Sequence, residues 1–333
     1  MSKVQFDRLF EQFQDVRVGV IGDVMLDTYI WGKVERISPE APVPVVSMQD
    51  KEHRIGGAGN VALNLRSLGA QVGILSIIGN DEDGKILTRL LDENGVDTAY
   101  LHTSASRITT NKTRILSRNQ QMMRLDSELT RDLESVDQMV LEAAVIKFLD
   151  EVKPQVVIFE DYNKGVLTEG VIHTVVRLCR ELKVLTAVDP KRKHFFSYRN
   201  VDIFKPNLKE VREGLNLADE DISHAFLQSI HEQLHSQLQH GISLITLSEK
   251  GIFYHNSEKQ DLIPSHIRNI SDVSGAGDTV IAVASLVYAV TGDVALMAAM
   301  ANIAGGLVCE EVGTAAIQKE RLLEECRQLL RDL

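Results

Sequence analysis

The chain repeatedly alternates short apolar runs with amphipathic segments, and this alternation restricts the possible fold more than any other feature. The apolar runs predict strands at 17–22, 71–78, 155–159, 184–188, 201–204 and 242–247. The amphipathic segments predict helices at 59–68, 81–94, 135–151, 168–182, 207 onward, 222–240, 275–290, 294–311 and 319–333. Strands separated by helices favour an α/β fold, in which a mostly parallel sheet carries helices on both faces.

One proline-rich segment interrupts the alternation. Residues 38–46 place three prolines among β-branched side chains, and proline is tolerated in edge strands and turns but not in central strands. Together with the basic, alternating segment 109–126, the segment 30–55 predicts a small antiparallel β lid, with a surface loop as the alternative. Because no Gly-, Ser- or Pro-rich linker is evident, we expect residues 1–333 to form one domain with this lid, and two apolar lids to meet in a homodimer.

The amino-acid composition argues against some classes of binding partner. The net charge is −11 and no block of Lys or Arg occurs, which argues against a nucleic-acid partner. Residues 1–15 lack the apolar core of a signal peptide, and the apolar stretch 280–290 is too short to span a bilayer. The cysteines are isolated in sequence, which is typical of reduced thiols. We therefore expect a cytoplasmic protein without a membrane partner.

The segment Asp272-Val-Ser-Gly-Ala-Gly-Asp278 leads directly into an apolar helix. Backbone N–H groups at the start of a helix are unpaired and the helix dipole is positive there, so Gly275, Ala276 and Gly277 predict an anion hole. Asp278 beside it would take a proton from a substrate hydroxyl while the hole stabilises a transferring phosphoryl group. This pairing indicates a kinase, and an ordinary helix cap is the alternative.

Further polar residues follow predicted strands. Asp23 and Asp27 lie near the end of the first strand, where paired carboxylates would suit adjacent sugar hydroxyls; capping or turn formation is the alternative. The segment Gly56-Gly57-Ala58-Gly59-Asn60 lacks the Walker pattern. It would allow either a phosphate loop or a close backbone approach to a polyol, with Asn60 as both donor and acceptor.

Taken together and in order, these motifs resemble a known family. Gly22-Asp23, Gly56 to Asn60, Asn207-Leu208-Lys209-Glu210 and Asp272 to Asp278 are similar to the signature set of the ribokinase-like (PfkB) carbohydrate kinases, over nearly the whole chain. Within that family, segments 36–46, 160–167 and 301–306 resemble the D-glycero-β-D-manno-heptose-7-phosphate 1-kinases. The resemblance implies a ribokinase-like fold. Val273 departs from it, because many members have threonine there.

The resemblance also implies roles for individual residues. Asp278 would be the catalytic base beside the anion hole of Gly275, Ala276 and Gly277. The residues implied to contact the sugar are Asp23, Asp27, Gly57 and Asn60. Those implied to contact the nucleotide are Asn207, Leu208, Lys209, Glu210, Ser248, Gly251 and Asn302. Asn207 and Glu210 would organise Mg²⁺ and the phosphates of ATP, and K⁺ near Asp272 is a further possibility of the family.

The substrate's own phosphate needs a cation. The candidates near predicted strand ends or the lid are Arg114, Arg124, Lys164 and Lys191, each of which is otherwise a solvated basic residue. The histidines, including His53 and His173, show no metal spacing and are expected to be solvated or structural.

The implied reaction transfers phosphate from ATP to O1 of D-glycero-D-manno-heptose 7-phosphate. The product is the 1,7-bisphosphate, a precursor of nucleotide-activated heptose for lipopolysaccharide. The alternatives are another sugar kinase of the family, such as a fructokinase or ribokinase, and a non-catalytic sugar-binding protein on the same fold. Many related kinases are fused to a nucleotidyltransferase with a His-x-Gly-His motif. No such motif occurs before Leu333, so we expect the kinase step alone.

Overall fold

The computed structural model describes residues 4–118, 120–218 and 221–331, and its main sheet confirms the predicted α/β architecture. The strands lie in the order β13-β12-β11-β10-β9-β8-β1-β4-β5. Their bounds are β1 (Arg17–Gly22), β4 (Gln71–Gly79), β5 (Leu101–Ser104), β8 (Val156–Glu160), β9 (Leu185–Asp189), β10 (Ile203–Phe204), β11 (Ile242–Thr246), β12 (Ile252–His255) and β13 (Gln260–Ile263). From β5 to β11 all pairings are parallel, and β12 and β13 add an antiparallel edge.

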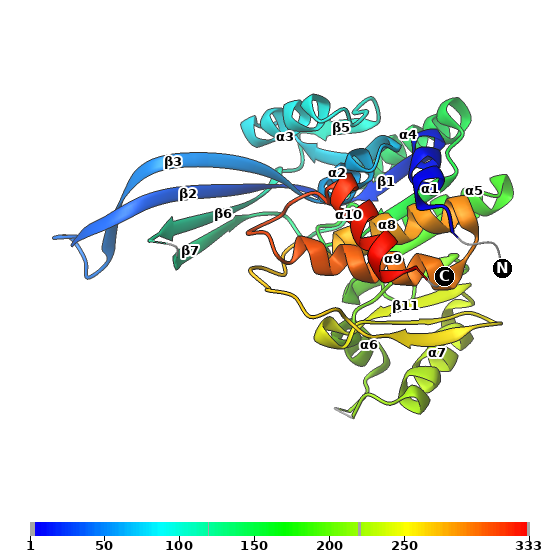
Figure 1. Cartoon of the computed structure of the whole chain (residues 1–333). Coiled ribbons are helices and arrows are strands. Elements are labelled where there is room, and N and C mark those ends of the chain that lie inside the picture. The colour runs from blue at the N-terminus through cyan, green and yellow to red at the C-terminus, as the bar shows by residue number, and fades with distance from the viewer. Residues whose placement is uncertain (1–3, 119, 219–220, 332–333) are drawn as a thin grey trace.

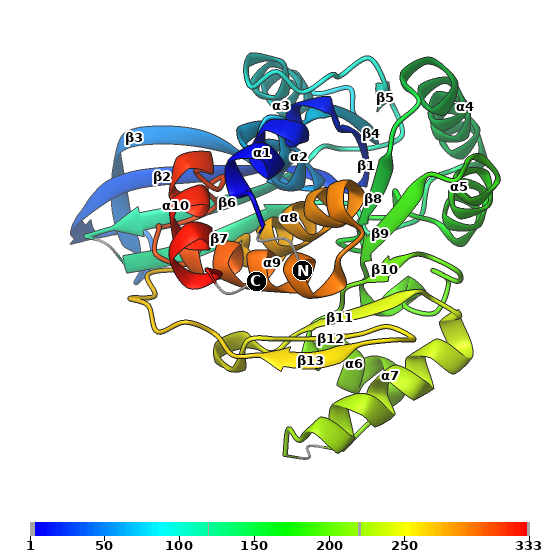
Figure 2. The ribbon, with the colours of Figure 1, turned by 45° about the vertical axis from the view of Figure 1, so that its right-hand side comes forward.

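Helices cover both faces of this sheet (Figure 2). The helices packed on one face are α1 (Phe6–Gln12), α2 (Ala58–Ser67), α3 (Glu82–Glu93), α8 (Ala276–Thr291), α9 (Val294–Val308) and α10 (Lys319–Leu329). Those on the other face are α4 (Ser135–Val152), α5 (Glu169–Leu182), α6 (Leu208–Leu215) and α7 (His224–Leu238). In the part of the chain described, no helix is long and apolar enough to cross a membrane.

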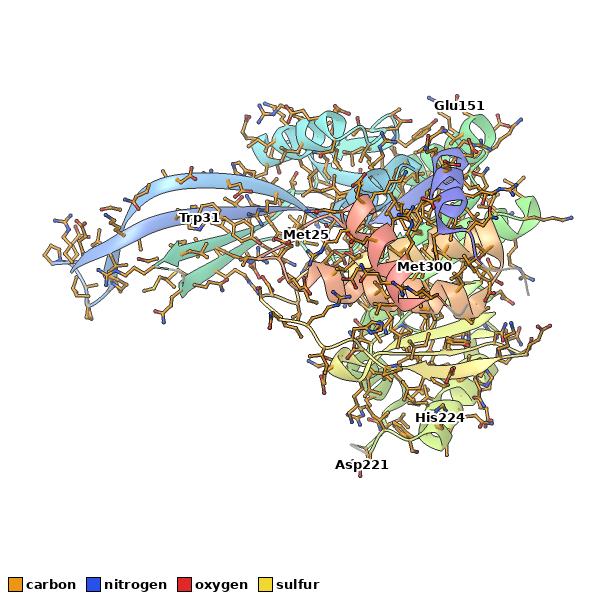
Figure 3. All side chains as sticks on the ribbon, in the orientation of Figure 1. Met25, Trp31, Glu151, Asp221, His224 and Met300 are labelled. Carbon is orange, nitrogen blue, oxygen red and sulfur yellow. The ribbon has the colours of Figure 1, made fainter. Side chains whose placement is uncertain are left out.

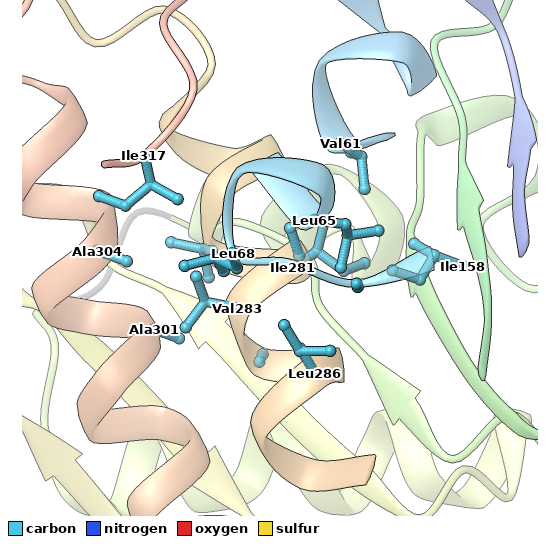
Figure 4. Packing of buried hydrophobic residues seen from close by; sticks show 14 of the residues in the cluster. Val61, Leu65, Leu68, Ile158, Ile281, Val283, Leu286, Ala301, Ala304 and Ile317 are labelled. Atoms are coloured by element: carbon cyan, nitrogen blue, oxygen red, sulfur yellow. The ribbon is translucent and has the colours of Figure 1, made fainter. Parts of the chain in front are cut away.

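The strands divide their side chains between two cores. In β8, Val156 and Ile158 belong to one buried cluster, while Val157 and Phe159 belong to the other. This follows from the alternation of side chains along a strand, and it explains why the central strands are apolar throughout. In the first cluster, residues of α2, α8 and α9 pack together, among them Leu65, Ile281 and Ala301 (Figure 4).

A smaller sheet forms a long lid that projects from the body (Figure 1). It consists of β2 (Val24–Ile37), β3 (Pro44–Gly57), β6 (Thr110–Ser117) and β7 (Gln120–Ser127), in the order β3-β2-β6-β7. Two antiparallel hairpins, β2-β3 and β6-β7, are joined by a parallel pairing of β2 with β6. Met25 lies where the lid meets the body, and Trp31 lies farther out along β2 (Figure 3).

The elements differ from the sequence predictions mainly at their ends. The lid begins at Val24, earlier than predicted, because β2 follows β1 after the single residue Asp23. The short strand β5 and the β12–β13 hairpin were not predicted. The last helix was predicted to reach Leu333, which lies outside the described residues; α10 ends at Leu329.

Candidate active site

Asp278 lies buried in the first turn of α8. Asn60 Nδ2 donates to its Oδ2 over 2.7 Å, and the Tyr162 hydroxyl donates to its Oδ1 over 2.8 Å. Burial raises the pKa of Asp278 to about 6, although both hydrogen bonds oppose the shift. A carboxyl with this pKa is mostly ionised at pH 7 and is a stronger base than an exposed aspartate. The fold thus brings Asn60 to Asp278 across 218 residues of sequence.

The turn before α8 leaves backbone donors open beside this carboxylate. Gly275 caps the helix at φ +78°, a conformation that residues with a side chain rarely adopt. The Ala276 N–H donates to the Val273 carbonyl over 3.3 Å. Within the described chain the N–H groups of Gly275, Gly277 and Asp278 have no acceptor. The open donors therefore include Gly275 and Gly277 of the predicted anion hole, together with the Asp278 N–H.

Asp23 anchors the loop that follows β8. Its carboxylate is 1% exposed and accepts hydrogen bonds from the backbone N–H groups of Tyr162, Lys164 and Val166 over 2.9 to 3.0 Å. These bonds place the Tyr162 hydroxyl near Asp278. Three of the roughly four acceptor positions of the carboxylate are thus used by the backbone, and the sugar contact of Asp23 stays a prediction.

Glu160, Asp189 and Lys205 form a buried group of ionisable side chains close to Asp278, to which the sequence analysis assigned no role. Glu160, Asp189 and Asp278 each offer a carboxylate oxygen within 4.8 Å of the others. Lys205 Nζ lies 2.8 Å from Asp189, and both approach the position that a Cβ on Gly277 would occupy. Neither carboxylate oxygen of Glu160 has a hydrogen-bond partner in the described chain, and burial raises its pKa well above the usual range. Glu160, Asp189 and Lys205 each directly follow a predicted strand, and this position was the sequence signal that could have identified them as site residues.

Several predicted site residues lie at the base of the lid. Asp27 on β2 is paired with Arg114 on β6, and both lie beside Tyr29, whose ring centroid is 5.3 Å from the Arg114 guanidinium carbon. Gly57 has φ +60°, and a Cβ there would lie 2.3 Å from the Asp23 carbonyl oxygen. Gly57 therefore allows β3 to pass close to Asp23 before α2 begins, which places Asn60.

The other predicted phosphate ligands are paired with carboxylates. Arg124 on β7 is half exposed and forms an ion pair with Asp126 on its own strand. Lys164 Nζ lies 2.8 Å from Glu128. Lys191 is paired with Glu210 and lies 3.4 Å from Asp189 as well.

Asn207 and Glu210 form a capping box at the start of α6. The Asn207 side chain accepts from the Glu210 N–H, and Glu210 Oε2 accepts from the Asn207 N–H, both over 2.8 Å. Glu210 Oε1 lies 2.6 Å from Lys191 Nζ. Both carboxylate oxygens of Glu210 are thus in use, which favours an indirect effect on a metal. Leu208 opens the helix and is partly buried, whereas Lys209 is 85% exposed and points to solvent.

The remaining predicted nucleotide residues lie around one loop. Ser248 begins a short 3-10 turn that ends before Gly251, and a Cβ on Gly251 would lie 1.9 Å from the Ile263 carbonyl oxygen. Asn302 on α9 donates to the Pro264 carbonyl over 2.8 Å. Gly251 and Asn302, which are distant in sequence, therefore both lie next to residues 263–265.

Asp272 organises the turn before the anion hole. Its carboxylate accepts from the Ser274 N–H and hydroxyl and from the Gly313 N–H, over 2.8 to 3.0 Å. Burial alone would raise the pKa of Asp272, but these hydrogen bonds lower it overall. The carboxylate thus stays ionised and connects the loop before α8 to the segment after α9.

A buried carboxylate beside open helix N–H groups, on a ribokinase-like fold, is an arrangement that suits phosphoryl transfer. The model of the pfkB family carbohydrate kinases matches residues 16–321, and the chain belongs to this family.

Two relatives carry the name bifunctional protein HldE. The chain is 38% identical over 328 residues to that of Syntrophotalea carbinolica, and 39% identical over 310 residues to that of Helicobacter hepaticus. These alignments cover 97% and 92% of this chain but only 66% and 63% of the relatives. The chain therefore spans slightly less than two thirds of their length.

Solved structures show the same fold at low identity. Phosphofructokinase-2 from Escherichia coli in complex with potassium superposes with a TM-score of 0.78 at 17% identity, covering 95% of this chain and all of that one. Ribokinase from Arabidopsis thaliana, complexed with ribose and ATP, gives a TM-score of 0.70 at 16% identity, covering 93% and 99%.

Proposed function

We propose that the protein is an ATP-dependent kinase that phosphorylates D-glycero-D-manno-heptose 7-phosphate at O1. The observation that carries the proposal is the buried Asp278 carboxylate, held by Asn60 and Tyr162 next to the open N–H groups of Gly277 and Asp278. The product would be the 1,7-bisphosphate, which serves as a precursor of nucleotide-activated heptose for lipopolysaccharide.

In this mechanism Asp278 removes the proton of the sugar O1 hydroxyl. O1 then forms a bond to the γ-phosphorus of ATP, the bond between that phosphorus and the bridging oxygen breaks, and ADP leaves. The N–H groups of Gly277 and Asp278 and the nearby Lys205 ammonium stabilise the negative charge on the transferring group. Lys205 is held beside Gly277 by Asp189, so its charge is already in place before substrate binds.

ATP brings a hard cation, and the oxygen-rich donors of the chain fit Mg²⁺. The unpartnered Glu160 carboxylate would hold it, while Asn207 and Glu210 would act indirectly by orienting Lys191. Mg²⁺ supplies charge neutralisation of the ATP phosphates. Ser248, Gly251 and Asn302 would contact the nucleotide, and Asp272 would lie near K⁺ if a monovalent ion binds.

Three segments that resemble the heptose kinases support the identity of the sugar, and so do the relatives named HldE. These segments are 36–46 on the lid, 160–167 at the end of β8, and 301–306 in α9. We further propose that residues 1–333 act as one kinase domain in the cytoplasm and form a homodimer through the lid.

Two measurements test this function. Release of ADP is measured with ATP, Mg²⁺ and a panel of sugars and sugar phosphates, in which heptose 7-phosphate should give the highest kcat/KM. The variant Asp278→Asn should retain sugar binding by calorimetry and lose about 10²- to 10⁴-fold in kcat, since it lacks the base. Nearly full turnover by Asp278→Asn would disprove the role of the base, and a preference for ribose or fructose would disprove the heptose assignment.

A further inference from the structure

One lysine at the site lacks the carboxylate partner that its neighbours have. Lys164, Lys191 and Lys205 each have a carboxylate oxygen within 2.8 Å. In the residues that the structure describes, Lys112 on β6 has no carboxylate within ion-pair distance. Its ammonium instead lies 5.3 Å from the centroid of the Tyr162 ring.

The register of the lid points Lys112 toward the sugar site. Lys112 pairs with Asp27 across β2–β6, so its side chain emerges on the same face of the lid as Asp27. This face also carries Arg114, which lies two residues along β6 and is already paired with Asp27. The Tyr162 ring beneath Lys112 belongs to the residue whose hydroxyl holds Asp278. One tyrosine side chain therefore separates this ammonium from the proposed base.

The environment of Lys112 favours an anion. Burial lowers the pKa of Lys112, and the nearby Lys164 adds to the effect, while Asp27 opposes it. Asp27 and Glu128 offset part of the cost of burying this ammonium, but neither forms an ion pair with it, so a directly bound anion would stabilise it further. A phosphate suits it well, because it accepts several charge-assisted hydrogen bonds at once.

We propose that Lys112 binds the phosphate group that the acceptor sugar already carries, at the end of the sugar remote from O1. The inference rests on the proposed sugar-phosphate kinase function and adds a residue that selects phosphorylated over unphosphorylated sugars. It adds Lys112 to the predicted candidates, among which Arg124 is exposed and paired with Asp126. Because Lys112 is on the lid and Tyr162 is on the body, a bound phosphate would connect the two.

The test compares Lys112→Gln with Lys112→Arg and with Lys51→Gln, an exposed lysine on the opposite face of the lid. Heptose 7-phosphate and unphosphorylated heptose are titrated into each protein by calorimetry, and KM and kcat are measured for both. Lys112→Gln should weaken binding of the phosphorylated sugar about tenfold or more and leave KM for ATP and for the unphosphorylated sugar nearly unchanged. Lys112→Arg should keep most of the affinity, and Lys51→Gln should behave as wild type.

Several outcomes would overturn the inference. Equal losses for both sugars in Lys112→Gln would indicate a structural role, and unchanged affinity for the phosphorylated sugar would exclude the contact. A thermal unfolding scan shows whether Lys112→Gln is folded, and Lys112→Arg supplies the answer if it is not. If wild type binds no sugar phosphate, the inference fails, while ADP release with other sugars still decides the kinase assignment. If wild type accepts a different sugar phosphate, only the heptose assignment fails, and the same comparison is made with that compound.

Discussion

Asp278 is kept reactive by a balance between burial and hydrogen bonding. Burial alone would push its carboxyl toward the neutral form, and the bonds from Asn60 and Tyr162 return it toward the ionised form. The resulting pKa of about 6 leaves the base ionised at neutral pH. Activity that depends on this group should therefore fall as pH drops through about 6, because the protonated carboxyl cannot accept the proton of the sugar.

The Tyr162 hydroxyl should help to set this pH dependence. Tyr162→Phe removes a hydrogen bond to the charged form of Asp278, so the pKa of Asp278 should rise and the acidic limb of the kcat/KM profile should move to higher pH. We expect kcat/KM at pH 7 to fall about threefold to tenfold, with recovery toward wild type at pH 8 to 9, since one such bond contributes about 1.5–3 kcal/mol. The profiles are measured by ADP release. A uniform loss of rate across all pH values would show that Tyr162 acts only on the fold.

Among the elements, α7, β11 and β12 enclose a group of histidines whose role is structural. His231 Nδ1 and His240 Nε2 both lie within hydrogen-bond distance of the Ser243 hydroxyl, at 2.9 and 2.6 Å. The rings of His231 and His255 stack with centroids 3.7 Å apart. Burial, followed by the neighbouring histidines, lowers the pKa of His231 to about 4 and that of His240 to about 3. The histidines were expected to be solvated or structural, and the burial of His231 and His240 fits a structural role.

This group should make stability sensitive to acid. Below pH 6.5 the unfolded chain binds protons that buried His240 cannot, so the free energy of unfolding should fall as pH drops, by about 2 kcal/mol per such histidine at pH 5. His240→Leu removes one of these groups. The difference in unfolding free energy between pH 7 and pH 5 should therefore be smaller in this variant than in wild type.

Denaturant titrations at pH 7 and pH 5 measure the two unfolding free energies. The loss of the Ser243 contact lowers both values by the same amount, so it does not affect their difference. The control is His224→Leu at the exposed start of α7, which should show the wild-type dependence. The other titratable residues near His240 are unchanged in wild type and in both variants. They are His231, His235, His255 and Glu232. An unchanged pH dependence in His240→Leu would contradict the structural account.

At the scale of the whole molecule, the lid exposes apolar side chains that the body does not cover. Met123 and Leu125 on β7 are 55% and 53% exposed, and both project from the face of the lid opposite to Arg114 and Arg124. Exposed apolar surface on a projecting sheet favours pairing with another protein surface. The proposed homodimer would cover it with the lid of a second copy.

Replacing both residues should break this dimer. Met123→Glu/Leu125→Glu places two like charges on the proposed interface, so its sedimentation mass should fall from twice 37.1 kDa to the single-chain value. The matched control is Met139→Glu, which alters a 61% exposed methionine on α4 and should leave the dimer intact. A wild-type protein of single-chain mass, or a dimeric double variant, would contradict the proposal.

The elements and the polar motifs were predictable from local sequence. Periodicity located β1, α2 and α5 to within about two residues, because each buries side chains at the spacing that its own geometry imposes. The glycine-rich turn before Asp278 and the capping box of Asn207 and Glu210 are likewise local, since each depends on residues within a few positions. The family resemblance rests on such local segments.

Which groups the charged side chains contact could be determined only from the tertiary structure. Asp23 binds the backbone of a loop that lies 139 to 143 residues later in the sequence, a contact that its sequence position did not predict. Lys112 and Lys164 are both lysines near the site, yet only Lys164 meets a carboxylate. The sequence specifies which residues can carry charge, whereas the approach of distant strands and loops decides which charges are paired. A group left without a counter-charge can be recognised only when its surroundings are known, and for this reason Lys112 emerged from the structure alone.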